Sequence, residues 1–355
     1  MNIISRYLIK RLTVMSCYAL LAILALYSFI DFLSEVGNIG KGSYTFWTAV
    51  QYIAMQMPAR AYQLMPLATL IGGLIALSQL SNNSEWAVIK TSGLSTKQLI
   101  GIILQFSLIF ALATAVLGEW LAPKLSQRAD TMKAIAKTGQ ISAVNNGVWL
   151  KQPYAMVNIS SMLPDKTLLD INIWRYNDAF QLTEVLAAER AKIVNNMWLL
   201  QQVKSSKISE DKTEASQQAQ LDWQMPIDEK LLAVLRVEPE QMSFSALSAY
   251  IRYLKNNAQQ TQMYEVAWWN KLIYPIATMV MALVALAFTP ISSRHTNMGL
   301  KLFGGICLGL LFFFTGRLFG FTTQLYHVPA FFSAVLPTAV FAVLAIYFIR
   351  KQEQR

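Results

Sequence analysis

Cysteine and histidine are scarce in this sequence, which limits the chemistry that the chain can perform. Its 355 residues contain two cysteines and two histidines. Cys17 and Cys307 both lie inside apolar runs, which argues against a disulfide framework or a cysteine-ligated metal. His295 and His327 are too far apart in sequence and in surroundings to form a familiar ligand pair. We therefore expect no metal site in this chain.

Motifs for nucleotide binding and for hydrolytic catalysis are also missing. The chain contains no GxxxxGKS/T phosphate-binding loop, no HExxH zinc motif and no GxSxG nucleophile motif. A membrane-anchored enzyme acting on lipid or peptidoglycan would need a nucleophile with its base, or a set of metal ligands. We therefore expect a non-catalytic chain that binds no cofactor of its own.

Charged residues are few, and they are unevenly distributed. They make up 14% of the sequence against 54% for hydrophobic residues, which is too apolar for an ordinary soluble protein of this length. Residues 124–266 hold 16 Lys/Arg and 15 Asp/Glu, whereas the rest of the chain holds 14 and 5. The positive surplus lies in the apolar part, where it is typical of a membrane-topology signal rather than a nucleic-acid surface. We expect contact with membrane lipids and none with nucleic acid.

Six apolar stretches are long enough to cross a bilayer as a helix, which takes about 20 residues. The first is too long for a cleavable signal peptide and lacks its small-residue cleavage site. Residues 45–57 extend the second stretch to about 51 Å of helix, too long for one straight crossing. We expect these residues to form a helix at or beyond the outer interface, kinked at Pro58. The six stretches are 12–34, 58–80, 98–122, 268–289, 302–325 and 330–349.

Lys and Arg in the short loops predict the orientation of the chain. The short connections of one side offer only Lys41, Arg60 and Lys271. Both termini should therefore be cytoplasmic, and the long insert should lie across the membrane, which in a bacterium means the periplasm. The cytoplasmic side collects Arg6, Lys10, Arg11, Lys90, Lys97, Arg294, Lys301, Arg350, Lys351 and Arg355.

The insert between the third and fourth spans has the two-residue period of β-strands. Short alternating segments with Asn-, Asp- or Pro-containing turns between them predict an antiparallel sandwich or jelly roll. The polar run Ser209–Gln220 is expected to be a mobile loop. Phe244–Lys255, capped by Ser243, is expected to form a helix that connects the β domain to the fourth span. The predicted strands are Tyr154–Ile159, Leu169–Tyr176, Thr183–Ala187 and Trp198–Val203.

The predicted fold is an α-helical membrane protein with six transmembrane helices, three on each side of an inserted periplasmic antiparallel β jelly roll. Its parts are residues 1–123, 124–266 and 267–355. A β-sandwich outside the membrane can simply have a packed core, or its sheets can splay to shelter acyl chains. The sequence pattern does not separate these two uses.

A short polar loop, residues 81–97, joins the second and third spans on the cytoplasmic side. Ser84 can cap a helix from Glu85 to Ser92, and Gly93 can end it. A helix of this kind can dock on a separate ATPase and transmit its motion, or it can lie on the membrane surface without a partner. Residues four apart share a face: Glu85 with Ile89, and Trp86 with Lys90.

Four separated segments of the sequence resemble the LptF/LptG permease family. They occur in the family's order, and the resemblance covers essentially the whole chain. Residues 118–123 and the overall pattern look closer to the LptG branch than to the LptF branch, which is the nearest alternative. The four segments are EWAVIKTSGLS (Glu85–Ser95), GEWLAP (Gly118–Pro123), LSAYIRYLK (Leu247–Lys255) and WWNKLIYP (Trp268–Pro275).

This resemblance implies a subunit of the lipopolysaccharide export complex in the inner membrane of Gram-negative bacteria. Such a permease pairs with a sister permease, here LptF-like, with a dimer of the LptB ATPase and with the single-span protein LptC. The complex extracts lipopolysaccharide from the outer leaflet and passes it to a bridge of jelly-roll domains. ATP and Mg would be used by the ATPase. The residues that would couple this chain to it are Glu85, Trp86, Ile89 and Lys90.

Lipopolysaccharide carries phosphates above several acyl chains, so its site should combine an apolar wall with a basic rim near the outer interface. Six candidates can supply the rim: Lys41, Arg60, Lys124, Arg128, Lys133 and Lys137. The last four form two i,i+4 pairs if the third helix continues outward. These cations would hold phosphate by charge-assisted hydrogen bonds. Alternatively, they only extend to lipid head groups, as Lys and Arg near helix ends often do.

Arg317 lies deep within the fifth span, where a charge facing lipid is costly. We expect it to face a cavity, a subunit interface or a carboxylate such as Glu119 or Asp31, and we include it among the substrate candidates. Glu119 itself is expected to order a helix end. The glycine pairs 305/309 and 316/320 on the same span have the spacing that permits close helix approach, as at a contact with the sister permease.

A third function, besides the permease and the membrane-anchored enzyme, is a scaffold that anchors a periplasmic β domain for other proteins. It predicts neither an ATPase partner nor lipid dependence. Glu85→Ala separates these functions, because a permease should then assemble normally and lose coupling to ATP hydrolysis.

Overall fold

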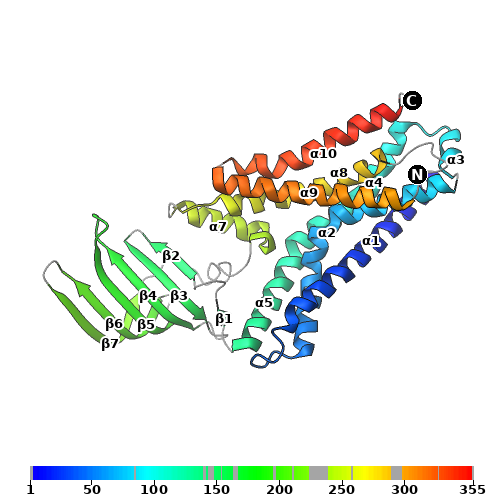
Figure 1. The fold of residues 1–355 in the computed structure, drawn as a ribbon. Helices are drawn as coiled ribbons and strands as arrows, with labels where there is room; N and C mark the ends of the chain where they lie inside the picture. Colours follow the sequence, from blue (N-terminus) through cyan, green and yellow to red (C-terminus); the bar gives the residue numbers. More distant parts are fainter. Residues whose placement is uncertain are drawn as a thin grey trace.

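The computed structural model describes residues 3–83, 85–138, 141–142, 148–152, 154–162, 167–194, 197–209, 212–223, 239–256, 259–288, 298–326 and 328–353. In this part of the chain, six helices are long and apolar enough to cross a membrane, as predicted (Figure 1). Five of them are single α-helices, and the third is extended by two further elements. The helices are α1 (Ile3–Val36), α2 (Phe46–Asn82), α4 (Thr96–Val116), α8 (Gln262–Ala287), α9 (Met298–Tyr326) and α10 (Ala330–Glu353).

Helix α2 is the central helix of the bundle and the most buried of the six. Its N-terminus is capped by Thr45, whose hydroxyl accepts from the Thr48 N–H. The helix continues through Pro58 for 37 residues, or about 55 Å, so residues 46–57 form the first part of α2 and extend it beyond a membrane-length stretch, which is one of the two placements that we expected. Ala49 and Ile53 are buried, so this first part of the helix packs within the chain.

The third span continues beyond the membrane-length stretch. Helix α4 passes into a π-helix at Leu117–Leu121 and then into α5 (Ala122–Thr138). Residues 124–138 therefore extend the helical bundle outward, and the first described strand of the insert begins at Ile141. The condition for the predicted i,i+4 basic pairs, a helix that continues outward, is met.

The described strands of the insert form one antiparallel sheet in the order β1-β3-β4-β5-β6-β7, with β2 also paired to β3. Alternate side chains such as Val157, Ile171 and Ile173 are fully buried on one face, as the two-residue period predicts. The second sheet of a jelly roll is not among the described strands. The strands are β1 (Ile141–Ser142), β2 (Val148–Gln152), β3 (Ala155–Met162), β4 (Leu168–Tyr176), β5 (Leu182–Val194), β6 (Met197–Ile208) and β7 (Thr213–Trp223).

The four predicted strands correspond to β3 to β6, but the expected loop at residues 209–220 was wrong. Most of that run belongs to β7, which pairs with β6 from Thr213 to Trp223. Its side chains are exposed except near the end, where Leu221 and Trp223 reach the core. Backbone hydrogen bonds to β6 hold this edge strand in the sheet. Most of its side chains are not needed for burial and are polar, so the run lacks the alternating apolar pattern that predicts a strand.

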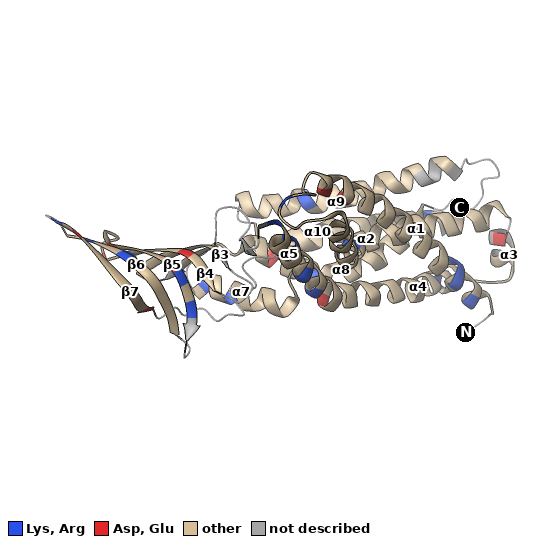
Figure 2. Ribbon diagram, turned by 90° about the horizontal axis from the view of Figure 1, so that it is seen from below, with Lys and Arg blue, Asp and Glu red and all other residues tan. Residues whose placement is uncertain are grey.

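The insert returns to the bundle through α7 (Phe244–Asn256), which confirms the predicted connecting helix. It packs on the start of α8 through a small core that includes Leu247, Tyr250 and Ala267. Both termini and the short helix α3 (Glu85–Thr91) lie at one end of the bundle, and the sheet lies beyond the other (Figure 1). Figure 2 shows charged residues on the sheet, on α5 and near α3 and the termini, whereas long stretches of the spans carry none.

Candidate functional site

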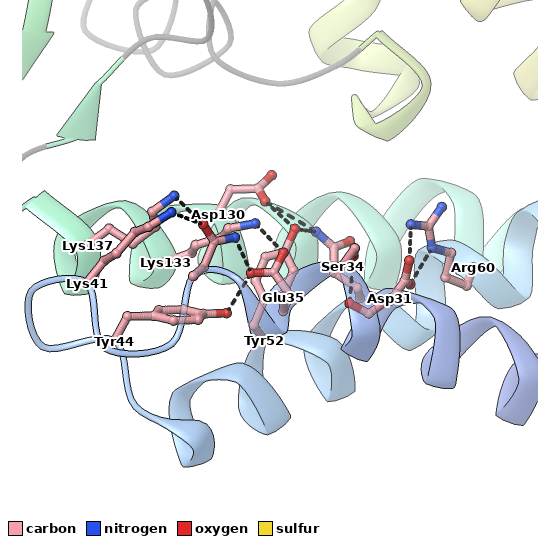
Figure 3. Close-up of polar contacts among 12 residues, drawn as sticks. Asp31, Ser34, Glu35, Lys41, Tyr44, Tyr52, Arg60, Asp130, Lys133 and Lys137 are labelled. Atoms are coloured by element: carbon pink, nitrogen blue, oxygen red, sulfur yellow. Dashed lines mark hydrogen bonds and ion pairs between the residues drawn. The ribbon is translucent and has the colours of Figure 1, made fainter.

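A cluster of polar side chains joins α1, α2 and α5 at the end of the bundle nearest the sheet (Figure 3). Its centre is Glu35, the last acidic residue of α1, whose side chain is 8% exposed. The Lys133 ammonium of α5 donates to this carboxylate, as do the Asn38 amide at 3.0 Å and the Tyr44 hydroxyl at 3.1 Å. Burial, followed by the neighbouring Glu35 charge, raises the pKa of Tyr44 well above its usual range. Four groups from three elements thus satisfy one another.

A second layer of the same cluster connects α2 with α5. The Tyr52 hydroxyl and the Gln56 amide both donate to Asp130, at 3.4 and 3.3 Å. The buried Ser126 hydroxyl donates to Gln56 at 2.9 Å, and the Lys133 ammonium lies 4.5 Å from the centre of the Tyr52 ring. The face of α5 that carries Ser126, Asp130 and Lys133 is therefore turned toward α2 and α1.

The loop between α1 and α2 packs directly on the end of α5. Asn38 accepts from Lys137 at 3.0 Å and from Lys41 at 3.4 Å. The backbone N–H of Ser43 donates to the Ala136 carbonyl at 2.7 Å. Gly42 has a φ of +60° and a side chain there would overlap the carbonyls of α5, so this close approach requires glycine.

Arg60 forms a two-pronged ion pair with Asp31 of α1, at 3.0 and 2.9 Å. This geometry fixes both side chains more firmly than a single contact would. The structure therefore brings four of the predicted rim residues into one region, each held by a partner within the chain: Lys41, Arg60, Lys133 and Lys137.

The other two rim candidates differ from these four. Lys124 and Arg128 are exposed on α5, one turn apart, and neither forms an ion pair or a hydrogen bond with the described residues. Arg317 is likewise exposed on α9. Its expected carboxylate partners are occupied elsewhere, because Asp31 pairs with Arg60 and Glu119 accepts from the backbone N–H of Phe244. Among the described residues neither candidate carboxylate pairs with Arg317, since both have nearer donors, and the cavity and the subunit interface remain the open alternatives.

The two glycine pairs of α9 have different surroundings. Added Cβ atoms at Gly305 and Gly309 would overlap leucine side chains of α2, so this pair already serves packing within the chain. Gly316 and Gly320 have nothing within 4 Å of an added Cβ. Of the two, only the second pair is open to contact with another helix.

Helix α3 is shorter than predicted by one residue and ends before Gly93, whose φ is +86°. The Glu85 carboxylate accepts from the Tyr7 hydroxyl at 2.7 Å and from Arg11 at 3.1 Å, both on α1. The bond from Tyr7 is the main reason that the pKa of Glu85 lies below its usual range. Ile89 is buried in the core of the bundle, whereas Val88 is 67% exposed.

Glu85 and Ile89 therefore dock α3 on its own chain, and Val88 beside them is presented outward. Sequence reasoning did not select Val88, because an isolated valine in a short helix carries no charge or motif. The side chains of Trp86 and Lys90 lie outside the described residues, as does the expected cap, Ser84.

Sequence reasoning used Lys271 of α8 only as a topology signal and did not predict its contacts. Its ammonium donates to the Gly118 carbonyl at 2.7 Å and lies 4.9 Å from the centre of the Tyr62 ring. Glu119, in the next position of the π-helix, caps α7 at Phe244, so its expected role in ordering a helix end applies to α7. The available signal was a lone lysine in an apolar helix, two residues after a pair of tryptophans.

Comparison with known proteins gives a family match over almost the whole chain and several curated relatives. A family model described as lipopolysaccharide export system permease LptF/LptG matches residues 6–351. Among similar curated proteins, the lipopolysaccharide export system permease protein LptG of Haemophilus influenzae is 28% identical over 354 residues, covering 99% of both chains. LptG of Escherichia coli K12 is 28% identical over 355 residues with the same coverage. LptF of Escherichia coli K12 is 29% identical over 155 residues, covering 41% of this chain and 42% of its own.

Proposed function

This chain belongs to the LptF/LptG family of lipopolysaccharide export permeases and is of the LptG type, and from this premise we propose how it works. It extracts lipopolysaccharide from the outer leaflet of a bacterial inner membrane and passes it to a periplasmic bridge of jelly-roll domains. The observation that carries the proposal is the extent of the match, residues 6–351, which takes in all six apolar helices and the sheet. The LptF alternative has a match to only part of the chain.

Both termini and α3 are placed in the cytoplasm, and the sheet is placed in the periplasm. The support for this orientation is twofold. The termini and α3 share one end of the bundle, opposite the sheet (Figure 1). The short loops of that end also carry most of the Lys and Arg of the membrane part, as cytoplasmic loops do.

Lys124 and Arg128 are the residues that first meet a lipopolysaccharide phosphate in this proposal. They are exposed, one turn apart, and have no ion-pair partner among the described residues. Arg317 offers a third such cation on α9. The four rim residues that already have partners shape the site and add to its positive field: Lys41, Arg60, Lys133 and Lys137.

Two of the proposed protein partners are assigned to surfaces of this chain that its described residues leave exposed. Gly316 and Gly320 make α9 a candidate contact for an LptF-like sister permease. The outward face of α3, with Val88, is a candidate contact for an LptB-like ATPase dimer, which binds ATP and Mg. Glu85 contributes by holding α3 on α1. An LptC-like single-span protein completes the complex.

Purification in mild detergent through a tag after the C-terminus, followed by mass spectrometry of proteins and lipids, tests this proposal. We expect an ATPase, a second six-span protein and lipopolysaccharide. Recovery of the chain alone, from a preparation in which other membrane complexes survive, would favour a scaffold and refute the permease complex.

The basic rim is tested by the same preparation from a double variant. Lys124→Ala with Arg128→Ala should lower the lipopolysaccharide that remains bound and leave the protein partners in place. Lys204→Ala with Lys207→Ala, two exposed lysines on β6, is the matched control and should change neither quantity. Equal lipid retention in the two double variants would contradict the assignment.

A further inference from the structure

The π-helix Leu117–Leu121 lies where spans α2 and α8 meet the third span. Lys271 of α8 donates to the Gly118 carbonyl at 2.7 Å. Its ammonium lies over the Tyr62 ring of α2, which in turn stacks on Tyr274, with ring centres 5.1 Å apart. A Cβ at Gly118 would overlap the Tyr62 ring, so only glycine lets the π-helix approach α2 this closely. One cation thus joins three spans.

The next residue of the π-helix joins the same point to the β domain. The Glu119 carboxylate accepts from the backbone N–H of Phe244, the first residue of α7, at 2.8 Å. Helix α7 has no acidic residue in its first turn, so Glu119 supplies the negative charge that a helix N-terminus favours. Helix α7 also packs on α8. The Phe244 and Trp268 ring centres are 4.7 Å apart, and the Trp268 indole N–H donates to the Ser248 hydroxyl at 2.9 Å.

The register of the π-helix also decides which way α5 faces. A π-turn accommodates one residue more than an α-helical turn, and one residue corresponds to about 100° of rotation about the helix axis. If the turn moved or was lost, α5 would rotate relative to α4. Asp130 and Lys133 would then no longer face α2 and α1, where they bind Gln56 and Glu35.

We propose that Lys271 is a positioning residue that holds the π-helix in register. Its bond to the Gly118 carbonyl keeps Glu119 on the N-terminus of α7 and keeps the polar face of α5 on α1. The third span, the fourth span and α7, which connects the β domain to the fourth span, then move as one unit during transport. A pocket of about 350 Å³, lined in part by Tyr62, Glu119 and Phe244, lies at this joint and gives the side chains room for a second arrangement.

Distances between spin labels on α5 and α7 test the proposal on the full-length chain in lipid nanodiscs. The labels replace Gln127 of α5 and Arg252 of α7, which are both exposed. The two native cysteines, Cys17 and Cys307, are exposed and are replaced by serine and alanine. We expect one narrow distance distribution when Lys271 is present. The measurement needs no transported lipid, so its outcome is independent of the proposed substrate.

Lys271→Met should add a second population, because loss of a charged hydrogen bond shifts the ratio of the two arrangements by roughly tenfold. Lys271→Arg, which can still donate to the Gly118 carbonyl, should restore the single distribution. Lys255→Met is the matched control. It removes the ion pair to Glu265, 2.8 Å long, which joins α7 to α8 without involving the π-helix, and should leave the distribution narrow.

Three results would overturn the proposal. They are an unchanged distribution in Lys271→Met, an equal broadening in Lys255→Met, and a second population that persists in Lys271→Arg. Glu119→Met replaces Lys271→Met if that variant does not accumulate, because it removes the acceptor of the Phe244 N–H and so releases α7 from the π-helix. This variant should show the same second population, and a single narrow distance distribution in it would also refute the proposal.

Discussion

Lys133→Met tests how strongly the buried carboxylate of Glu35 depends on its cation. The side chains of Glu35 and Lys133 are 8% and 24% exposed, so the pair is largely removed from water. Two other donors, Asn38 and Tyr44, remain after the substitution. The carboxylate then keeps its charge in a buried position with two neutral hydrogen bonds and no counter-ion, and the folded state is destabilised.

The size of the effect follows from this geometry. Breaking a fully buried ion pair costs about 3–5 kcal/mol, and the partial exposure of Lys133 together with the remaining donors reduces our expectation to about 2 kcal/mol. Lys137→Met removes the same side chain one turn later, where among the described residues it bonds the neutral Asn38 amide at 3.0 Å. It should cost about 0.5–1 kcal/mol. Adding Glu35→Gln to Lys133→Met should recover about half of the loss, because no charge is then left unpaired.

Thermal unfolding of the purified chain in detergent, followed by circular dichroism, ranks the variants. We expect the midpoint of Lys133→Met to lie lowest, the double variant above it and Lys137→Met closest to the unmodified protein. Equal midpoints for the two lysine variants would refute the reasoning, as would a double variant less stable than Lys133→Met alone. Either result would mean that the Glu35 carboxylate is solvated rather than held by Lys133.

Three further predictions concern other parts of the chain. Val88→Asp on the outward face of α3 should abolish co-purification of the ATPase without changing the melting temperature, and retained ATPase would exclude this face from docking. Gly72→Ala should destabilise the bundle by about 1–3 kcal/mol in thermal unfolding, since its Cβ would overlap the backbone of Ser16; an unchanged midpoint would show that α1 and α2 can separate freely. Burial raises the pKa of Tyr250, so its contribution to stability is present below about pH 10 and lost as the pH rises toward the higher folded-state pKa. Alkaline unfolding followed by circular dichroism should therefore begin above about pH 10, and an equal alkaline response in Tyr250→Phe would contradict this cause.

The helices were the most predictable part of the fold. Their number follows from the length of the apolar runs, because a membrane span needs a continuous stretch of apolar residues. The extent of α2 was less predictable. The apolar run and Pro58 suggested a boundary near residue 58, whereas α2 is one helix from Phe46 to Asn82 with Pro58 inside it. Burial of Ala49 and Ile53, which depends on packing, was not visible in the sequence.

The sheet was predictable where its strands bury one face. Strands β3 to β6 alternate in the two-residue period, whereas β7 is held by its backbone and exposes most of its side chains. A strand of that kind has the composition of a loop, so residues 209–220 were assigned wrongly. The π-helix at Leu117–Leu121 had no recognisable signal in the sequence either.

The sequence by itself determined the six spans, the inserted antiparallel β domain, the connecting helix α7 and the family resemblance. These features depend on run length, periodicity and motifs, which are all local along the chain. Only the tertiary structure decided the partners of the charged residues. Lys133 and Glu35 are 98 positions apart, Lys271 and Gly118 are 153 apart, and Asp31 and Arg60 belong to different helices. An ion pair forms between the groups that packing brings within about 4 Å, and that distance is set by how whole helices and strands approach one another.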